Sequence, residues 1–257
     1  MKTIFLGYPL VQLQSVDSTN NLASQYLKQG KVEEGTVILA VHQTSGRGQG
    51  SNTWVSEQGS NLLFSIILKP DFLPAHKQFY LSMAVALGIQ GDVSGLGISA
   101  LIKWPNDIVT NRKKLAGVLI ENTILSRNLN SSVIGIGVNV NQLIFPSDIP
   151  DPTSLALEAG HSFDLSDSLK ELLSSLEVQI NKLYQGNLAE IKSAYLNRLW
   201  LMNTEAVFND QTGKFRGRIV DIADTGELVV KMKRGETRTY GFKEVVFEKE
   251  DAGSRIY

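Results

Sequence analysis

The chain has 257 residues, of which 42% are hydrophobic and 20% charged, so its composition is that of an ordinary folded protein with room for one large domain and one small one. Its formal net charge of −1 offers no electrostatic attraction toward nucleic acid or an anionic membrane. The absence of cysteine excludes disulfides, zinc–thiolate sites and cysteine nucleophiles, and the three histidines lack the spacing of metal ligands.

The first thirty residues predict a strand followed by a helix. Residues 1–9 are apolar but lack the small-residue cleavage pattern of a signal peptide, so we expect them to form a first strand. Asp17-Ser18-Thr19-Asn20 is a cluster of helix-capping residues before apolar residues at helical spacing, and Gly30 ends that run. No apolar run approaches the ~20 residues that span a bilayer. We therefore expect a cytoplasmic protein with no membrane partner.

The middle of the chain combines strands and helices. Apolar runs predict strands at 36–42, 61–68, 99–104, 107–110, 115–121 and 133–140. The turn at 111–113 predicts a hairpin between two of these strands. A helix is expected after Pro74, ending near Gly91, and helical periodicity continues at 165–184 and 188–200.

The last part of the chain changes to short strands at close spacing. They are expected at 205–208, 214–222, 227–233, 238–242 and 245–247. Such spacing predicts a small barrel, so we expect a larger domain at 1–201 and a β-barrel domain at 202–257. The basic residues Lys231, Lys233 and Arg234 of this domain are interpreted as a solvated face.

The glycine-rich segment 43–54, directly after the strand at 36–42, is the most informative part of the sequence. Glycines let backbone amides approach an anion closely. Arg47 supplies a forked cation for carboxylate or phosphate, and the Trp54 indole offers a flat face to a ring. These residues fit a loop that closes over a charged small molecule. A glycine-rich segment without a following helix is also typical of a mobile connection.

Two lysine-containing segments follow. Lys103-Trp104-Pro105-Asn106-Asp107 places a cation, an indole, an amide and a carboxylate around a proline that keeps the tryptophan out of a helix. Lys113 and Lys114 open the strand at 115–121, where a lysine drawn partly out of water can act as a fixed cation. Both segments also have a structural interpretation, as a turn with a half-buried tryptophan and as lysines flanking a hairpin.

Two further polar groups have two interpretations each. Ser18-Thr19-Asn20 can cap a helix or surround a urea-like or carboxyl head group, because together they offer donors and acceptors. Alternation places Asn139 and Asn141 on one strand face with Gly135 and Gly137, where amides can read an adenine edge or simply end a strand.

Taken in chain order, these segments resemble the biotin protein ligases of the monofunctional type, without a DNA-binding domain. The matching pieces are 17–20, 43–54, Ser56, Gly59, 61–62, 103–107, 114–117 and 135–141. The run Lys-Trp-Pro-Asn-Asp followed by Lys-Leu-Ala-Gly, downstream of Gly-Arg-Gly, is highly specific in combination. The resemblance covers the predicted larger domain and, less distinctly, the barrel.

The resemblance implies an α+β fold, a mixed β-sheet with helices packed on it as in the class II synthetase-like catalytic domain of biotin and lipoate ligases. A small C-terminal Src-homology-3-like β-barrel follows. It also implies a two-step reaction with ATP, biotin and Mg²⁺. Biotin and ATP form biotinyl-5′-adenylate and pyrophosphate, and a lysine of a biotin carboxyl carrier protein domain of a biotin-dependent carboxylase then attacks, leaving AMP.

The resemblance further implies catalytic roles for Lys114 and Arg47, which would offset the repulsion between the biotin carboxylate and the α-phosphate. Lys114 matches better than Lys113, because it directly precedes Leu-Ala-Gly. The implied binding residues are Ser18, Thr19, Asn20, Gln43, Gly46, Arg47, Gly48, Gln49, Trp54, Lys103, Asn106, Asp107, Lys114, Gly117, Gly135 and Asn139.

Some of these residues have specific implied partners. Ser18, Thr19 and Gln43 match the ureido ring of biotin. Trp54 packs on adenine and Asn139 reads its edge, while Asn106 and Asp107 lie near phosphate, with Asp107 as the candidate Mg²⁺ ligand. The segment 46–52 is expected to close over the adenylate and exclude water.

The sequence departs from the family pattern in two ways. Many members carry a second arginine where Gln49 stands and a glycine where Ser51 stands, so retention of the adenylate would rest on Arg47 and Lys114. Repressor-type members carry an N-terminal helix-turn-helix domain, whereas 16 residues precede Asp17 here. We therefore expect no DNA binding.

Two other functions are weighed against this one. A lipoate–protein ligase shares the fold and the adenylation step, but the pattern at 103–107 argues against it. A non-catalytic sensor of biotin or adenylate would be expected to lack Arg47 or Lys114. The sequence leaves open whether the protein is a monomer or a homodimer.

Overall fold

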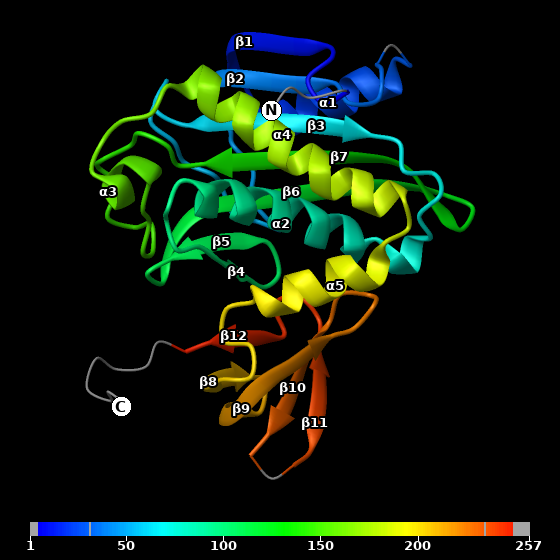
Figure 1. The fold of residues 1–257 in the computed structure, drawn as a ribbon, viewed down its shortest axis with the longest axis vertical. Helices are drawn as coiled ribbons and strands as arrows, with labels where there is room; N and C mark the ends of the chain where they lie inside the picture. The colour runs from blue at the N-terminus through cyan, green and yellow to red at the C-terminus, as the bar shows by residue number, and fades with distance from the viewer. Residues whose placement is uncertain (1–4, 31, 234, 249–257) are drawn as a thin grey trace.

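The computed structural model describes residues 5–30, 32–233 and 235–248 and arranges them around two separate β-sheets (Figure 1). The larger part contains β1 (Leu10–Val16), α1 (Thr19–Lys28), β2 (Val37–Gln43), β3 (Leu62–Leu68), α2 (Phe79–Gly95), β4 (Leu101–Lys103), β5 (Asp107–Thr110), β6 (Lys113–Leu125), β7 (Asn128–Val138), α3 (Leu155–Ala159), α4 (Leu165–Tyr184) and α5 (Leu188–Asn197). The smaller part contains β8 (Glu205–Asp210), β9 (Gly213–Ile222), β10 (Leu228–Met232), β11 (Thr237–Tyr240) and β12 (Val245–Phe247).

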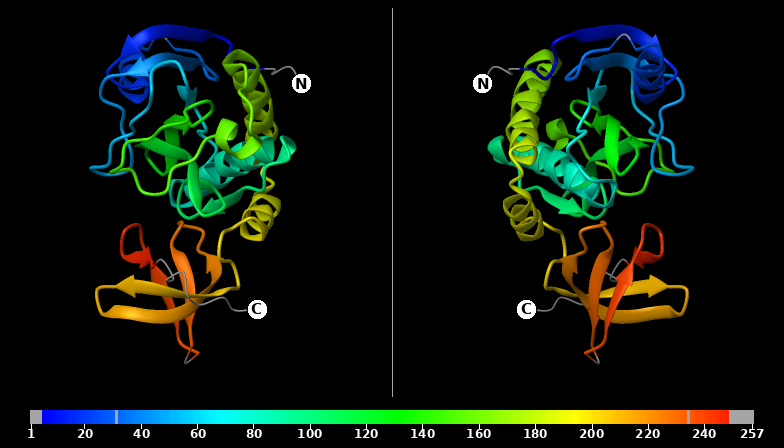
Figure 2. Two further views of the ribbon diagram at one scale, coloured as in Figure 1. Left: turned by 90° about the vertical axis from the view of Figure 1, so that its left-hand side faces the viewer. Right: turned by 90° about the vertical axis from the view of Figure 1, so that its right-hand side faces the viewer.

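The larger sheet is mixed, as predicted, with the strand order β1-β2-β3-β7-β6-β5-β4. Strands β1 and β2 pair in parallel, and the other neighbours pair antiparallel. A parallel pair needs a crossover connection, which α1 supplies. Helix α1 packs on β2, β3 and β7, while α2 packs on β4, β5 and β6 and is covered by α4 and α5. Figures 1 and 2 show α2 and α4 together on one side of the sheet.

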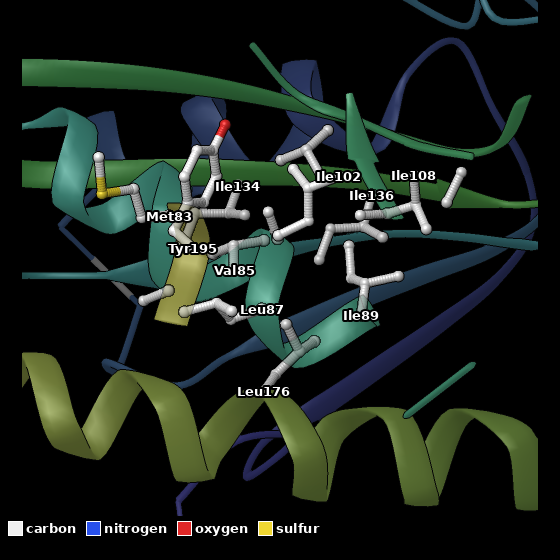
Figure 3. Close-up of a cluster of buried hydrophobic side chains, with 14 of the residues drawn as sticks. Met83, Val85, Leu87, Ile89, Ile102, Ile108, Ile134, Ile136, Leu176 and Tyr195 are labelled. Carbon is white, nitrogen blue, oxygen red and sulfur yellow. The ribbon is translucent and has the colours of Figure 1, made fainter. Parts of the chain in front are cut away.

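Strand β3 is buried along its whole length because helices cover both faces of the sheet. Ile67 packs with Ala23 of α1, whereas Phe64 and Ile66 belong to the core on the α2 side. Such a strand is a continuous apolar run and does not alternate. Figure 3 shows the core on the α2 side, where Ile134 of β7 lies near side chains of α2.

Helix α2 runs beyond the predicted end at Gly91 as far as Gly95. The helix is buried between the sheet, α4 and α5, and this burial outweighs the ~1 kcal/mol cost of a glycine inside a helix. Gly88 allows the close approach of α4, since a Cβ there would lie 2.8 Å from the Leu176 Cα.

The predicted first strand at 1–9 is wrong for the residues that can be described. Residues 1–4 lie outside the described part, and residues 5–9 form turns and bends before β1 begins at Leu10. The backbone amides of Phe5 and Leu6 donate hydrogen bonds to the Glu177 carboxylate of α4 and not to a neighbouring strand. Gly7 has a φ of +84°, which further interrupts an extended backbone.

The other predicted elements are present, most of them with shifted ends. The hairpin turn is confirmed, with positive φ at Asn111 and Arg112 between β5 and β6. The short helix α3 was not predicted, although Ser154 at its start caps it by accepting from the Leu157 amide. The five C-terminal strands form one antiparallel sheet, consistent with the predicted small barrel.

The barrel is attached to the start of α2 and to the 103–107 corner. The Trp104 Nε1 donates to the Gly226 carbonyl at 2.9 Å, and the Trp104 and Phe242 rings lie 5.3 Å apart. The Tyr80 hydroxyl donates to Asp224 at 2.8 Å, and burial together with this carboxylate raises the pKa of Tyr80 to about 12. Trp104 is therefore an interface residue, buried to 3% exposure. Within the ranges 5–30, 32–233 and 235–248, no helix combines the length and apolarity needed to cross a membrane.

Gly88→Ala should destabilise the fold by about 1–3 kcal/mol, because the added methyl would overlap the Leu176 backbone. Gly91→Ala on the same helix is the matched control, since a Cβ there meets no atom within 4 Å. This control should gain roughly 0.5–1 kcal/mol from helix propensity. Urea unfolding of both variants measures the contrast, and equal shifts would contradict the close contact.

Asp92 on α2 makes stability depend on pH. Burial, and secondly the nearby Glu171, raise the pKa of Asp92 to about 6. The folded chain therefore holds this proton more tightly than the unfolded chain, and stability should fall as pH rises from the unfolded pKa through about 6. Asp92→Asn should be more stable than the parent at pH 8 and no more stable at pH 3.5, as measured by unfolding at both pH values.

Candidate active site

One cavity of about 430 Å³ brings the predicted segments together. It is bounded by the start of α1, the segment 47–54, the 103–107 corner, β6, β7 and one end of the barrel. All but two of the predicted site residues line it: Ser18, Thr19, Asn20, Gln43, Arg47, Gly48, Gln49, Trp54, Lys103, Asn106, Asp107, Lys114, Gly117 and Gly135. The exceptions are Gly46 and Asn139.

The start of α1 forms a tightly bonded polar wall. The amide and hydroxyl of Thr19 both donate to Gln43 Oε1, at 2.8 and 3.1 Å. Ser65 Oγ of β3 lies within hydrogen-bond distance of both Thr19 Oγ1 and Asn20 Oδ1. Asn20 Nδ2 donates to the Leu119 carbonyl and to Glu121. Asn20 is therefore committed to protein partners on both ends of its amide.

Ser18 stands at the N-cap position of α1, but its side chain makes no capping hydrogen bond. Its hydroxyl has no hydrogen-bond partner in the part of the chain that the structure describes, although the residue is only 2% exposed. The predicted capping role of this side chain is wrong. Its unused hydroxyl faces the cavity with Gln43, whose Oε1 is occupied while its Nε2 has no protein acceptor among the described residues.

Glycines on β6 and β7 make room for the cavity wall. A Cβ at Gly135 would lie 2.3 Å from Asn20 Oδ1, and one at Gly137 would lie 2.4 Å from the Trp54 ring. A Cβ at Gly117 of β6 would lie 3.0 Å from the same indole. Substitution at any of these positions would push Asn20 or Trp54 out of place. Gly137 was not among the predicted site residues, although it shares the strand alternation of Gly135.

The glycine-rich segment is folded back on itself. The Trp54 amide donates to the Gly46 carbonyl at 3.0 Å, and the Gly48 amide donates to the Asn52 carbonyl at 2.8 Å. A Cβ at Gly46 would lie 2.4 Å from the Trp54 carbonyl oxygen, so this glycine closes the turn and does not line the cavity. Trp54 lies beneath Lys114, whose Nζ is 5.7 Å from the indole centre.

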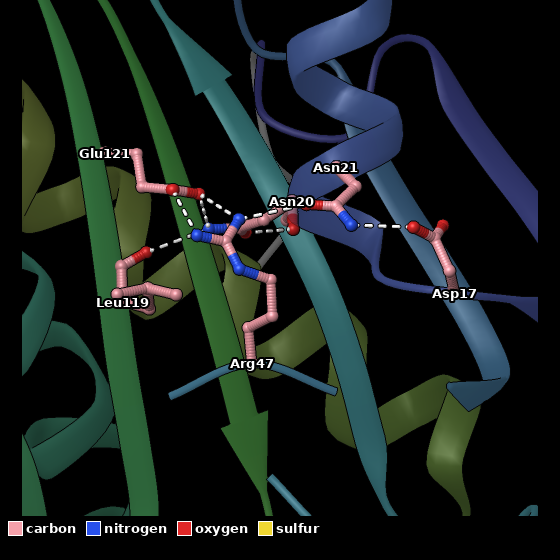
Figure 4. Close-up of polar contacts among 7 residues, drawn as sticks. Asp17, Asn20, Asn21, Arg47, Leu119 and Glu121 are labelled. Carbon is pink, nitrogen blue, oxygen red and sulfur yellow. Dashed lines mark hydrogen bonds and ion pairs between the residues drawn. The ribbon is translucent and has the colours of Figure 1, made fainter. Parts of the chain in front are cut away.

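Arg47 projects from this segment to a carboxylate that sequence reasoning missed. Its guanidinium forms a two-pronged ion pair with Glu121 of β6, with Nη2–Oε1 at 2.7 Å and Nη1–Oε2 at 3.1 Å (Figure 4). Nη1 also donates to Asn21 Oδ1 at 2.9 Å. Asn21 in turn donates to Asp17, and this hydrogen bond lowers the pKa of Asp17.

Lys114 and Asp107 form the second ion pair of the site, with Nζ–Oδ1 at 2.7 Å. They come from neighbouring antiparallel strands, β6 and β5. Beside them, the Asn106 side chain donates to the Val118 carbonyl, which fixes the 103–107 corner against β6. The hairpin that sequence reasoning offered as the structural interpretation of Lys114 is thus also what brings it to Asp107.

Asn139 does not occupy the position predicted for a residue that reads adenine. Strand β7 ends at Val138, so the alternation with Gly135 and Gly137 stops there. Asn139 is 5% exposed and donates to the Thr153 carbonyl at 2.9 Å, while its backbone amide bonds to Leu115. It therefore holds the segment before α3 against the sheet.

The barrel contributes a wall that the sequence did not reveal. Lys243, Val245, Val246 and Phe247 line the cavity, and Lys243 Nζ would lie 2.2 Å from a Cβ built on Gly50. A lysine in a barrel turn carries no sequence signal for such a position. Lys231 and Lys233 are exposed and away from the cavity, as expected of a solvated face, and Arg234 lies outside the described residues.

The cavity attracts anions. Its described lining carries four cations, Arg47, Lys103, Lys114 and Lys243, against the single carboxylate of Asp107. Lys103 Nζ lies 5.5 Å from the Trp200 ring and 5.8 Å from the Phe247 ring. Such a surface suits a triphosphate and a carboxylate together.

The residues do not fit a metal held by the protein alone. Among the described residues no group of three or more histidine or acidic side chains is placed to hold an ion. Asp107 is a single carboxylate already paired with Lys114. A Mg²⁺ ion at this site would therefore need most of its oxygen ligands from nucleotide phosphates and water.

Comparisons with known proteins agree with this geometry. Residues 12–139 match the Biotin/lipoate A/B protein ligase family. The chain is 32% identical over 246 residues to the bifunctional ligase/repressor BirA of Bacillus subtilis, covering 93% of this chain and 74% of that protein. It is 29% identical over 234 residues to the biotin–[acetyl-CoA-carboxylase] ligase of Paracoccus denitrificans, covering 87% of this chain and 94% of that protein.

A solved structure is similar over nearly the whole chain. The biotin protein ligase from Aquifex aeolicus in complex with biotin and ATP superposes with a TM-score of 0.77 at 28% identity, covering 94% of this chain and 99% of that one. The shared architecture, the extent of the BirA similarity and the match over 12–139 give one conclusion: the chain belongs to the biotin/lipoate A/B protein ligase family.

Proposed function

We propose that this protein is a biotin protein ligase, which activates biotin with ATP and transfers it to a lysine of a carrier domain. The observation that carries the proposal is the convergence of Lys114, Asp107 and the α1 polar wall on one cation-rich cavity. The similarity to a biotin protein ligase solved with biotin and ATP supports the same assignment.

The reaction has two balanced steps. A carboxylate oxygen of biotin attacks the α-phosphorus of ATP, the bond to the β-phosphate oxygen breaks, and pyrophosphate leaves. The amine of an acceptor lysine then attacks the carbonyl carbon of the mixed anhydride, AMP leaves with the bonding electrons, and the amine proton passes to solvent. The first step brings two anions into contact, and in both steps negative charge develops on the leaving phosphate, so fixed cations contribute directly to the rate.

Different walls of the cavity provide the groups that these two steps require. Ser18 Oγ and Gln43 Nε2 lie at the α1 wall with unused hydrogen-bond capacity, and together they match the acceptor and donors of a ureido ring. Lys114, oriented by Asp107, is the cation for the reacting carboxylate and α-phosphate. Trp54 presents an indole beside Lys114 for the adenylate. When it accompanies ATP, Mg²⁺ supplies further neutralisation of the phosphates.

The proposed acceptor is the biotin carboxyl carrier protein domain of a biotin-dependent carboxylase. The printed name of the Paracoccus denitrificans relative, a biotin–[acetyl-CoA-carboxylase] ligase, supports a carboxylase as the source of the carrier. Because the reaction consumes ATP, we place it in the cytoplasm.

A lipoate–protein ligase is the competing assignment, because the matched family includes both activities. Pyrophosphate exchange with ATP and either biotin or lipoate separates them, followed by labelling of an apo-carrier domain. Exchange with biotin alone is the expected result. Exchange with lipoate alone would replace the assignment, and exchange with neither would indicate a non-catalytic binding protein.

Lys114→Ala should lower the rate of adenylate formation about 10²–10³-fold, because a fixed cation at the developing charge is lost. Lys113→Ala is the matched control, since Lys113 is exposed and lies outside the cavity lining. Biotin-dependent pyrophosphate exchange measures both, with thermal unfolding to check the fold. A near-normal rate for Lys114→Ala would reject its catalytic role.

Gln49→Arg should slow escape of the adenylate roughly 10–100-fold, because Gln49 lines the cavity and a charged donor there would add a charge-assisted hydrogen bond. Gln49→Glu reverses the sign and should speed escape. Release is measured by trapping free adenylate from the preformed complex. An unchanged release rate for Gln49→Arg would remove this position from adenylate retention.

A further inference from the structure

The guanidinium of Arg47 is committed to partners within the protein. Glu121 accepts hydrogen bonds from Nη1 and Nη2, and Asn21 accepts a further hydrogen bond from Nη1. The two-pronged geometry with a carboxylate both neutralises the charge and fixes the plane of the group. Three of the five N–H groups are engaged in this way, and the Glu121 carboxylate offsets the positive charge that an incoming phosphate would meet.

Glu121 connects Arg47 to the cavity wall. Its Oε2 accepts from Asn20 Nδ2 at 2.9 Å, and Asn20 Oδ1 accepts from Ser65 Oγ at 2.6 Å. Asn20 is 3% exposed, so this end of the network is rigidly buried. The chain of contacts shown in Figure 4 thus ties the glycine-rich segment to β6 and to the start of α1.

The cavity has other cations for the anionic substrate. Lys103 and Lys243 line it and have no carboxylate partner in the described ranges, unlike Arg47 with Glu121. Lys114 pairs with Asp107 inside the cavity lining, whereas Glu121 lies outside that lining. The charge that meets the phosphates can therefore come from lysines alone.

We propose that Glu121 is a positioning residue that acts through Arg47, holding segment 46–54 in the conformation that closes the cavity. This assignment rests on the proposed function, because closure matters for a hydrolysable adenylate. It replaces the catalytic role expected for Arg47, whose side chain orients the segment and does not neutralise the phosphate. Neither Glu121 nor its pairing with Arg47 was expected from the sequence.

The opposite interpretation predicts effects of opposite sign. If Glu121 merely occupied Arg47 until phosphate arrived, Glu121→Gln would free the cation, lower the KM for ATP and slow adenylate release. If Glu121 positions the segment, the same variant should loosen it and speed release. Arg47→Lys separates the two roles again, because lysine keeps the charge but cannot form the two-pronged pair.

The test is a double-mutant cycle on Arg47→Gln and Glu121→Gln, read first by hydrogen exchange of amides in 48–54 without substrate. Each single variant should exchange about tenfold faster than the parent, and the double variant no faster than either, because the two groups form one interaction. Arg47→Lys should match Arg47→Gln. Asp167→Asn, which removes an exposed ion pair with Lys170 on α4, is the control and should leave the segment unchanged.

The second readout is adenylate release, where the singles and the double should again share about the same tenfold increase. Additive effects, parent-like Arg47→Lys, or tighter ATP binding by Glu121→Gln would each overturn the proposal. Arg47 is 43% exposed, so its variants test the idea even if Glu121→Gln fails to fold. Hydrogen exchange of the amides in 48–54 can be measured without enzymatic activity. If the parent showed no biotin-dependent pyrophosphate exchange, only the proposed function would be rejected.

Discussion

The close approach of Trp54 and Asn20 to the glycines of β7 is the contact on which the rest of the site depends. A single methyl group at Gly135 or Gly137 would lie 2.3 or 2.4 Å from these side chains. Because the strand surface is bare there, the glycine-rich segment and the start of α1 can both reach the sheet and enclose a cavity between them. The sheet itself resists adjustment, since β3 beside β7 is buried along its whole length.

Charge in the site is organised in pairs. Lys114 pairs with Asp107 across two neighbouring strands, and Arg47 pairs with Glu121 between the glycine-rich segment and β6. Each pair both places a cation and restricts how far it can move. Lys103 and Lys243, which have no carboxylate partner among the described residues, leave the lining with an excess of positive charge for an anionic substrate. The near-zero net charge of the whole chain conceals this local imbalance.

The barrel belongs to the functional unit through specific contacts. Trp104 hydrogen-bonds to Gly226 on its barrel side, and Lys103 one residue earlier lies in the cavity lining. The 103–107 corner therefore serves the interface and the site at the same time. Lys243 and Phe247 extend the cavity wall from the barrel. A substitution in the barrel can thus alter substrate binding without touching the larger sheet.

Local patterns in the sequence determined the elements and the list of reactive segments. Helix 165–184, strand 107–110 and strand 245–247 have the predicted bounds, because side-chain periodicity and turn residues act over a few neighbours. Motif order also identified most of the cavity lining. The tertiary structure decided what depends on contacts across the fold: the end of α2, the structural use of Asn139, the pairing of Arg47 with Glu121 and the arrival of Lys243. These outcomes depend on which strands pair and in what register, and no local run of residues encodes contacts between segments far apart in the chain.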